Sequence, residues 1–495
     1  MGCGQIQLQY AQPKFQNEKD IDLSLDLDIP IIQKQVSNHV VIIGCTHAGT
    51  VAAAVLRNGS KAIQITIFEK NQTISFLSCG IHLALMGVCT NLNQMFYNSI
   101  ATLKSLDIEV QDNTEVQQID YGARIVYFKN QSTCLLGSIN YDKLIIATGS
   151  KQYLPKLIKM NSPRILFCKN YNDTLKLLKL KFKTVAILGA GHIGTELAYA
   201  LTEVKAKVKL IDQSQRIMQK YFEEFYTDII QDEFLTKGAE LFLGQQIKSV
   251  ESTDTGVCIL FGDQQIEAEF VILAAGFSPN TKMVLQSDNL KILKHNNTAL
   301  QVNSKQETSI LNVYAAGDCC QIFNNSVKQD LYLPLATHAI RQGAVAAYQI
   351  LGKDITMQGT QGSFGIQIFS FALACTGISS DTMGIQNIAK IMLSEDIIRN
   401  FTPTEDDISS IIIIFSEVTF KILGCQIMGT RDSTGLVDLV SMAISQNMTI
   451  QELSMIEISS NSNIGPFMHI LQKVCLAAFL QVPRFEKQQL DEQIE

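Results

Sequence analysis

One cysteine, Cys79, stands in a sequence context that favours redox chemistry without a disulfide. It ends the run Ile-Ser-Phe-Leu-Ser-Cys at residues 74–79, and the positions three and five residues beyond it hold His82 and Ala84. The chain therefore has neither a C-x-x-C pair nor a C-x4-C pair here. A reactive thiol that lacks a resolving partner can cycle through sulfenic acid. Cys79 is accordingly the first candidate catalytic residue.

The segments on either side of Cys79 predict where its thiol lies. A strand-like stretch, Ile63–Glu69, ends ten residues before it, and an apolar segment, Ile81–Leu85, follows it. This order puts the thiol at or near the first turn of a helix. The N–H groups at the N-terminus of a helix favour the thiolate, which is the reactive form of cysteine. We therefore expect this position to favour the thiolate.

The first half of the chain carries a dinucleotide-binding pattern. A short apolar run at residues 39–43 is typical of a buried parallel strand, and Gly44-Cys-Thr-His-Ala-Gly49 and an Ala/Val-rich helix, Thr50–Leu56, follow it. A second strand, Ile63–Phe68, ends at Glu69, twenty residues past the last glycine. In this pattern the glycines permit a tight turn, the helix N-terminus faces a pyrophosphate, and the acid binds the ribose hydroxyls.

The same pattern recurs 145 residues later in complete form. Strand Thr184–Leu188, the fingerprint Gly189-Ala-Gly-His-Ile-Gly194, helix Thr195–Glu203 and strand Lys207–Ile211 lead to Asp212. A single G-x-G-x-x-G is a weak signal, and the first copy has Thr46 in place of its middle glycine. Two copies with correctly spaced acids are a strong signal of dinucleotide binding. The chain is therefore predicted to bind two dinucleotides.

The acid of the second copy also predicts which nicotinamide cofactor is used. A carboxylate at Asp212 hydrogen-bonds a free 2′-hydroxyl and repels a 2′-phosphate, which favours NADH over NADPH. Arg216, four residues further on, argues in the other direction, because a nearby arginine accommodates a 2′-phosphate. NADH is the expected substrate.

Composition excludes several classes of protein. With 495 residues, 46% hydrophobic and 18% charged, the chain is long enough for two to four domains. Its net charge of −7, without a basic stripe, argues against a nucleic-acid partner. The twelve cysteines are scattered without zinc-type pairing, which is typical of a reducing, cytoplasmic setting, and no metal is expected. No apolar run of about 18 residues occurs, so we expect no transmembrane segment and no secretory signal.

Both ends of the chain are expected to be polar extensions. Residues 1–38 predict a disordered leader, and residues 483–495 predict a polar tail. Met1-Gly2-Cys3 resembles the start of a lipidated protein, although position 6 is Ile where Ser or Thr is usual. Two interpretations stay open, a lipid tether at Gly2 and Cys3 and an unmodified leader, and the sequence favours the second.

Three further segments complete a family resemblance. Tyr141–Ser150, Phe270–Gly276 and Val313–Asp318 are apolar strands that end in small residues or in an acid. Together with the two glycine loops and Ser75-Phe-Leu-Ser-Cys-Gly80, they resemble the pyridine-nucleotide–disulfide oxidoreductase family. Within it, they resemble the branch of NADH oxidases, NADH peroxidases and coenzyme A–disulfide reductases. The first glycine loop is most similar to that of water-forming NADH oxidases.

This resemblance implies two sets of cofactor-binding residues. The residues expected around FAD are Gly44, Cys45, Thr46, His47, Ala48, Gly49, Glu69, Cys79, Val116, Ala147, Thr148, Gly149, Ser150, Lys169, Asp318, Leu335 and Ala336. The residues expected around NADH are Gly189, Gly191, His192, Ile193, Gly194, Asp212, Tyr221 and Gly276. Cys79 would be the thiol/sulfenic acid centre beside the flavin. His47, whose imidazole can donate and accept protons, would be catalytic near the reacting oxygen.

The implied fold class is α/β, with two Rossmann-like dinucleotide-binding domains, for FAD and for NAD, and a C-terminal α+β dimerisation domain. We expect the FAD domain to be discontinuous, at residues 39–155 and 270–350. The NAD domain is expected at 156–269 and the dimerisation domain at 356–482. A homodimer is the expected assembly.

The leading hypothesis is an FAD-dependent NADH oxidase that reduces dioxygen to water. Reduction of dioxygen to water takes four electrons, and one NADH delivers two. A thiol that reacts with the peroxide formed by the first two electrons, and is then reduced by a second NADH, accounts for all four. The related alternatives are an NADH peroxidase and a coenzyme A–disulfide reductase.

A different alternative is a catalytically weakened flavoprotein that acts as a redox-responsive binding protein. Two departures from the family motivate it. His192 stands where a Tyr usually shields the nicotinamide pocket, and the C-terminal loop at Ser459–Ile464 lacks the usual aromatic and proline residues.

Overall fold

A computed structural model describes residues 39–154, 162–284, 298–382, 386–396, 408–429, 435–458 and 468–481. Several expectations concern other parts of the chain. The leader at 1–38 with its Gly2 and Cys3 tether, the loop at Ser459–Ile464 and the tail at 483–495 lie outside the described residues.

The first half of the chain is built on a five-stranded parallel sheet in the order β18-β7-β1-β2-β3. Its strands are β1 (His39–Ile43), β2 (Gln64–Phe68), β3 (Ile108–Gln111), β7 (Lys143–Ile146) and β18 (Val313–Ala315). Successive side chains of a strand point to opposite faces, and both faces of this sheet are covered. Val40 and Ile42 pack with helices α1 (His47–Gly59) and α7 (Ala336–Ile350). Val41 and Ile43 pack with the antiparallel sheet β4-β5-β6 (Thr114–Asp120, Ile125–Asn130, Leu136–Asn140).

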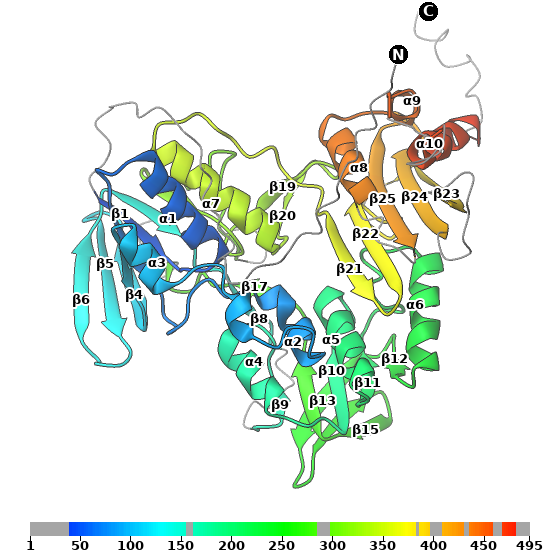
Figure 1. The fold of residues 1–495 in the computed structure, drawn as a ribbon, viewed down its shortest axis with the longest axis horizontal. Helices are drawn as coiled ribbons and strands as arrows, with labels where there is room; N and C mark the ends of the chain where they lie inside the picture. Colours follow the sequence, from blue (N-terminus) through cyan, green and yellow to red (C-terminus); the bar gives the residue numbers. More distant parts are fainter. Residues whose placement is uncertain are drawn as a thin grey trace, which may run out of the picture.

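The second nucleotide-binding half repeats this layering (Figure 1). A five-stranded parallel sheet has the order β12-β11-β10-β16-β9. Its strands are β9 (Ile165–Leu166), β10 (Thr184–Leu188), β11 (Lys207–Ile211), β12 (Glu240–Phe242) and β16 (Phe270–Leu273). Helices α4 (Tyr171–Leu178), α5 (His192–Glu203) and α6 (Glu224–Thr236) belong to the cluster on one face. The sheet β13-β14-β15 (Ile247–Ser252, Val257–Phe261, Gln264–Ala268) covers the other face.

One predicted boundary is wrong. The FAD domain was expected to resume at residue 270, but β16 pairs in parallel with β10 of the second sheet, for example Ile187 with Ile272. The physical reason is that an apolar strand is buried by whichever sheet offers a free edge, and the sequence of the strand does not say which. The chain returns to the first half after this strand and adds β18 to the first sheet.

Several short elements accompany the two sheets, among them the segment that carries Cys79. They are a 3₁₀ turn (Ser78–Gly80), α2 (Ile81–Leu85), a second 3₁₀ turn (Leu92–Met95), α3 (Ile100–Ser105), and the two-stranded pairs β8-β17 (Ser150–Gln152, Phe277–Pro279) and β19-β20 (Ile322–Asn324, Gln329–Leu331). Helix α2 packs against α4 and α5 of the second half. The cysteine segment therefore leaves the first half and ends against the second.

The C-terminal part is an antiparallel sheet in the order β21-β22-β25-β24-β23, with helices on one side. The strands are β21 (Phe364–Ile368), β22 (Phe371–Gly377), β23 (Ile388–Asp396), β24 (Ile408–Ser416) and β25 (Ile422–Gly429). The helices are α8 (Gly435–Ser445), α9 (Ile450–Ser454) and α10 (Ile470–Gln481). The α/β class and the Rossmann-like halves are confirmed. Across the residues that the structure describes, no helix has the length and apolar character that a bilayer crossing needs.

A buried acid joins the second half to the C-terminal part. Glu223, which precedes α6, is 5% exposed and forms an ion pair with Lys390 of β23. Its carboxylate also accepts hydrogen bonds from the N–H and the hydroxyl of Ser380, at 2.7 and 2.5 Å. Burial alone would raise the pKa of the Glu223 carboxyl, but Lys390 and Ser380 outweigh it and lower that pKa below its ordinary value of 4.5.

Replacing this acid tests its contribution to the fold. The Glu223→Gln variant should lower the free energy of unfolding by about 2 kcal/mol at pH 7, because it weakens hydrogen bonds to a charged group. The depressed pKa makes this contribution present above pH 4.5 and lost as pH falls through the lower folded-state value. Thermal unfolding of both proteins between pH 3 and 8 measures the difference. Glu233→Gln, which removes an exposed pair with Lys237, is the matched control and should change little. A constant difference down to pH 3 would contradict the assignment.

Candidate active site

Both glycine loops are fixed by the same hydrogen bond. The N–H of Cys45, the second residue of the first loop, donates to Glu69 at 2.9 Å. The N–H of Ala190, the second residue of the other loop, donates to Asp212 at 2.6 Å. Each acid thus holds the loop that starts the neighbouring helix. Its other carboxylate oxygen accepts from the chain just beyond the acid, from the N–H of Asn71 for Glu69 and from the N–H of Ser214 for Asp212.

The last glycine of each loop is required by close packing. A Cβ at Gly49 would lie 1.9 Å from the carbonyl oxygen of Gly44, and a Cβ at Gly194 would lie 1.8 Å from that of Gly189. The middle position is different, because a Cβ at Gly191 would meet nothing within 4 Å. Thr46, which occupies the middle position of the first loop, is exposed, so its side chain fits the same backbone path.

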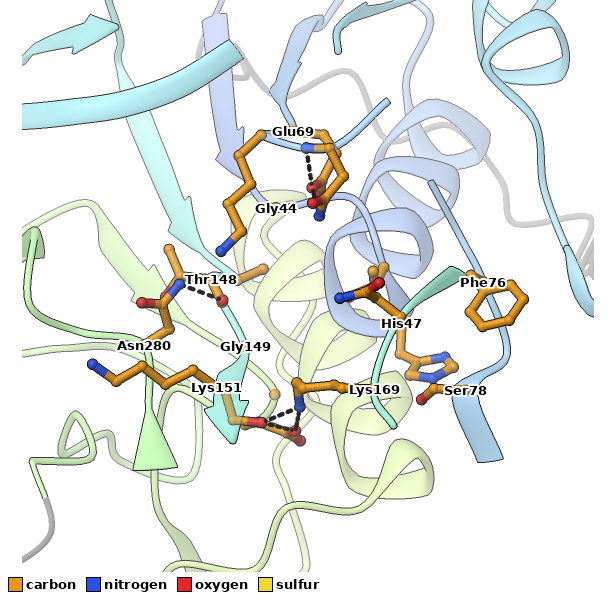
Figure 2. Close-up of a pocket in the computed structure, with 18 of the residues that line it drawn as sticks. Gly44, His47, Glu69, Phe76, Ser78, Thr148, Gly149, Lys151, Lys169 and Asn280 are labelled. Atoms are coloured by element: carbon orange, nitrogen blue, oxygen red, sulfur yellow. Dashed lines mark hydrogen bonds and ion pairs between the residues drawn. The ribbon is translucent and has the colours of Figure 1, made fainter. Parts of the chain in front are cut away.

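A cavity of about 510 Å³ opens over the first loop, a size that is usual for ligand sites. In Figure 2, Gly44 and Glu69 lie at one end of it, and His47 and Ser78 lie across from Lys151 and Asn280. Twelve of the residues expected around FAD line this cavity: Gly44, Thr46, His47, Ala48, Glu69, Val116, Ala147, Thr148, Gly149, Ser150, Lys169 and Asp318.

Five expected residues lie outside the cavity lining. Cys45 is fully buried, and burial raises the pKa of its thiol to about 12, so it serves packing. Gly49 packs under the loop. Leu335 and Ala336 lie at the start of α7, three residues before the lining residue Ala339. Cys79 adjoins the lining residue Ser78.

A hydrogen-bonded chain of Lys169, Ser150 and Asp318 lies along the cavity. The ammonium of Lys169 donates to the hydroxyl of Ser150 at 2.7 Å, and that hydroxyl donates to Asp318 at 2.7 Å. Lys169 also lies 3.8 Å above the ring of Phe277. Burial lowers the pKa of Lys169, and the charge of Asp318 acts against that shift. Orphaned polar atoms at the site, Thr148 Oγ1 among them, fit a polar ligand that is bound there.

Cys79 lies in the 3₁₀ turn that leads into α2, as predicted. The expectation that this position favours the thiolate is wrong. Partial burial, and then the negative charge of Glu196, raise the pKa of the Cys79 thiol, although its side chain still reaches solvent. The five-residue helix that follows offers too little of a dipole to reverse this.

Glu196 links the cysteine segment to the second glycine loop. Its carboxylate lies 3.6 Å from Nδ1 of His82 on α2 and 3.3 Å from Nε2 of His192 on its own helix. The His192 ring stacks on Phe364 of β21, with centroids 4.7 Å apart, and the Tyr221 ring meets the same phenylalanine edge-on. His192 and Tyr221, both expected near NADH, therefore share a partner from the C-terminal part.

The other residues expected near NADH lie within the second glycine loop or beyond β16. Gly189, Gly191 and Gly194 form its turn, and Ile193 is partly buried against the core. Gly276, beyond β16, has φ +97° and open space around it, so its backbone is free to approach a ligand.

Tyr97 fixes the imidazole of His47. The two rings stack with centroids 5.2 Å apart and 10° between their planes. Burial lowers the pKa of His47, with Asp318 opposing and Lys169 adding to the effect. Nδ1 of His47 is buried and has no hydrogen-bond partner in the described part of the chain. His47 is thus a neutral imidazole that can accept a proton at the cavity wall.

Sequence reasoning missed four of these residues. Glu196 carried a usable signal, because it stands four residues after His192 on the predicted helix. Tyr97, Phe364 and Lys151 carried none, since they come from segments without a recognisable motif.

The first prediction for this site concerns the charge at Cys79. In Glu196→Gln, the pKa of the Cys79 thiol should fall, because a carboxylate that disfavours the thiolate is gone. The rate of iodoacetamide labelling against pH, read for each peptide by mass spectrometry, measures this. Cys134, which is exposed, provides the control in the same digest. An unchanged profile for Cys79 would refute the role of Glu196.

The second prediction concerns the stacked imidazole. Tyr97→Leu should admit water and raise the pKa of His47 toward its ordinary value of 6.5. The acid limb of the pH–activity profile should then move to higher pH, while Tyr97→Phe, which keeps the ring, should leave it in place. Tyr127→Leu, at an exposed tyrosine, is the control. The stack has no such function if the limb stays in place in Tyr97→Leu.

Comparisons with known proteins agree with this geometry. Residues 38–343 match the family model of the pyridine nucleotide-disulphide oxidoreductases. An NADH oxidase of Enterococcus faecalis is 33% identical over 84% of this chain and 93% of its own length, and one of Streptococcus pyogenes is 32% identical over 85% and 94%. The solved structure of a water-forming NADH oxidase from Lactobacillus brevis, bound to NADH, superposes with a TM-score of 0.86 at 30% identity, covering 90% of this chain and 99% of that one. The chain belongs to the pyridine nucleotide-disulphide oxidoreductase family.

Proposed function

We propose that the chain is an FAD-dependent NADH oxidase that reduces dioxygen to water through a thiol/sulfenic acid centre at Cys79. The observation that carries this proposal is the position of Cys79. It adjoins Ser78 in the wall of the dinucleotide cavity, and Figure 2 shows the imidazole of His47, whose pKa burial lowers, next to Ser78 on the same side of that cavity. The NADH oxidases that match over more than four-fifths of the chain support the activity.

The cofactors are FAD and NADH. Glu69 and the first glycine loop suit the adenosine and pyrophosphate of FAD, with Lys169 and Asp318 along the rest of the cavity. Asp212 and the second loop suit NADH. FAD, when bound, supplies a two-electron carrier between NADH and both dioxygen and Cys79.

The residues of the chain account for the second half of the reaction. Two electrons convert dioxygen to hydrogen peroxide, and the Cys79 sulfur then attacks its O–O bond. The S–O bond that forms gives sulfenic acid, and the departing hydroxide takes a proton to leave as water. His47 accepts the thiol proton and returns it to the departing oxygen. The hydride of a second NADH, with one proton, restores the thiol and releases the second water.

The stoichiometry of the reaction tests the role of Cys79. The wild type should consume about two NADH per dioxygen, because four electrons reach each molecule. Cys79→Ser should consume about one and release hydrogen peroxide. An oxygen electrode, NADH absorbance and a peroxide assay measure all three quantities. Cys89→Ser, a nearby partly buried thiol, is the matched control and should keep the wild-type ratio. An unchanged ratio in Cys79→Ser would remove the sulfenic acid centre from the mechanism.

The alternative functions are outcomes of the same set of assays. Anaerobic NADH consumption that needs hydrogen peroxide identifies a peroxidase, and consumption that needs a coenzyme A disulfide identifies a disulfide reductase. A protein that holds FAD and oxidises NADH no faster than free flavin is the weakened flavoprotein.

We infer that the assembly is a homodimer formed through the C-terminal part. Apolar side chains are exposed on its helices, with Met442 66%, Met455 74% and Leu480 73% exposed. Exposed apolar side chains that gather on one part of a chain support an interface there. The cytoplasmic location and a lipid tether at Gly2 and Cys3 stay predictions.

A further inference from the structure

One turn of the C-terminal part forms hydrogen bonds and an ion pair with the loop that follows Asp212. Residues 379–382 come after β22, and the loop at residues 212–223 comes after β11. Ser380 hydrogen-bonds Glu223 at one end of this loop. Asp381 forms an ion pair with Arg216 nearer its other end, with 2.6 Å between Nη2 and Oδ2. A domain outside the Rossmann-like half thus contacts the segment next to Asp212.

Arg216 lies in the part of this loop that borders the nucleotide-binding turn. The N–H of Ala190, in the glycine loop, donates to Asp212 at 2.6 Å, and the carbonyl of Ala190 accepts from the N–H of Met218 at 2.8 Å. Residues 212 and 218 are therefore both tied to one residue of the glycine loop, and Arg216 lies between them in sequence. In Rossmann-like folds an arginine near the second acid is the group that accommodates a 2′-phosphate.

The charge of Arg216 is already engaged. Its side chain is 17% exposed, and its guanidinium is directed at the C-terminal part by the ion pair with Asp381. Gln219 donates to the same carboxylate oxygen at 3.3 Å and so helps to hold Asp381 in place. Nε of Arg216 is buried without a hydrogen-bond partner among the described residues, and Nη2 donates to Asp381 at 2.6 Å.

We propose that Asp381 is a specificity-determining residue that favours NADH over NADPH by holding Arg216 away from the 2′ position of the bound nucleotide. A 2′-phosphate then meets the carboxylate of Asp212, while Arg216 stays paired with Asp381. Discrimination against NADPH therefore needs both acids. Asp212 repels the 2′-phosphate, and Asp381 keeps Arg216 from pairing with it. This inference rests on the proposed use of NADH and concerns the same site.

The test compares four flavin-loaded proteins: the wild type, Asp381→Asn, Arg216→Gln and the double variant. Steady-state kinetics give the ratio of kcat/KM for NADPH to that for NADH. Asp381→Asn should raise this ratio about tenfold, the factor that one charge-assisted hydrogen bond contributes. Arg216→Gln alone should leave the ratio within about twofold of the wild type. The double variant should lack the rise in the ratio that Asp381→Asn produces alone. Lys390→Met breaks the neighbouring contact with Glu223 without touching Arg216 and should leave the ratio unchanged.

A binding measurement keeps the test independent of turnover. Calorimetry with 2′,5′-ADP should show tighter binding to Asp381→Asn than to the wild type, and no gain in the double variant. The comparison of Asp381→Asn with its parent is repeated in a protein that also carries Asp212→Ser. There Asp212 no longer repels the phosphate, so any change in binding reports the effect of Arg216. An unchanged ratio and unchanged binding in both backgrounds, or a gain that persists without Arg216, would overturn the inference. A wild type that does not oxidise NADH refutes the proposed function instead, and the calorimetry still decides the role of Asp381.

Discussion

The hydrogen bond from each glycine loop to the acid of the next strand is the constraint on which the rest of the site depends. Cys45 donates to Glu69 and Ala190 donates to Asp212. Because each bond fixes the turn that starts a helix, it also fixes the first residue of that helix. Those residues are His47 and His192, the first residues of α1 and α5. One repeated interaction therefore sets the positions of two acids, Glu69 and Asp212, and of two imidazoles.

Cys79 lies outside the two glycine loops, but its segment packs on helices of the second half. Its segment leaves the first half after β2 and ends in α2, which packs on α4 and α5 of the second half. Its thiol is consequently under the influence of Glu196, a residue of α5. The same carboxylate contacts His82 and His192, so the charge near the thiol and the position of the His192 imidazole are physically connected.

The sequence was enough to predict the strands and loops whose signals are local. Thr184–Leu188 is an apolar run that ends at Gly189, and Lys207–Ile211 alternates lysine with apolar residues before Asp212; the structure gives both strands the predicted bounds. The raised pKa of Cys79 was not predictable from its helix position, because it arises from burial in the folded chain and then from the charge of Glu196, 117 positions along the chain. Tyr97, Phe364 and Asp381 belong to the same class, since only the folded chain brings them to His47, His192 and Arg216. The strand at Phe270–Leu273 was recognised, but its sheet was not, because pairing partners are chosen by tertiary packing.

The central claim is that one cysteine stores two electrons beside a flavin. The most direct measurement is an anaerobic titration of the peroxide-oxidised, FAD-loaded protein with NADH, followed by flavin absorbance. The account predicts two NADH per subunit, one for the Cys79 sulfenic acid and one for FAD, and only one in Cys79→Ser. Uptake of a single NADH by the oxidised wild type would contradict it.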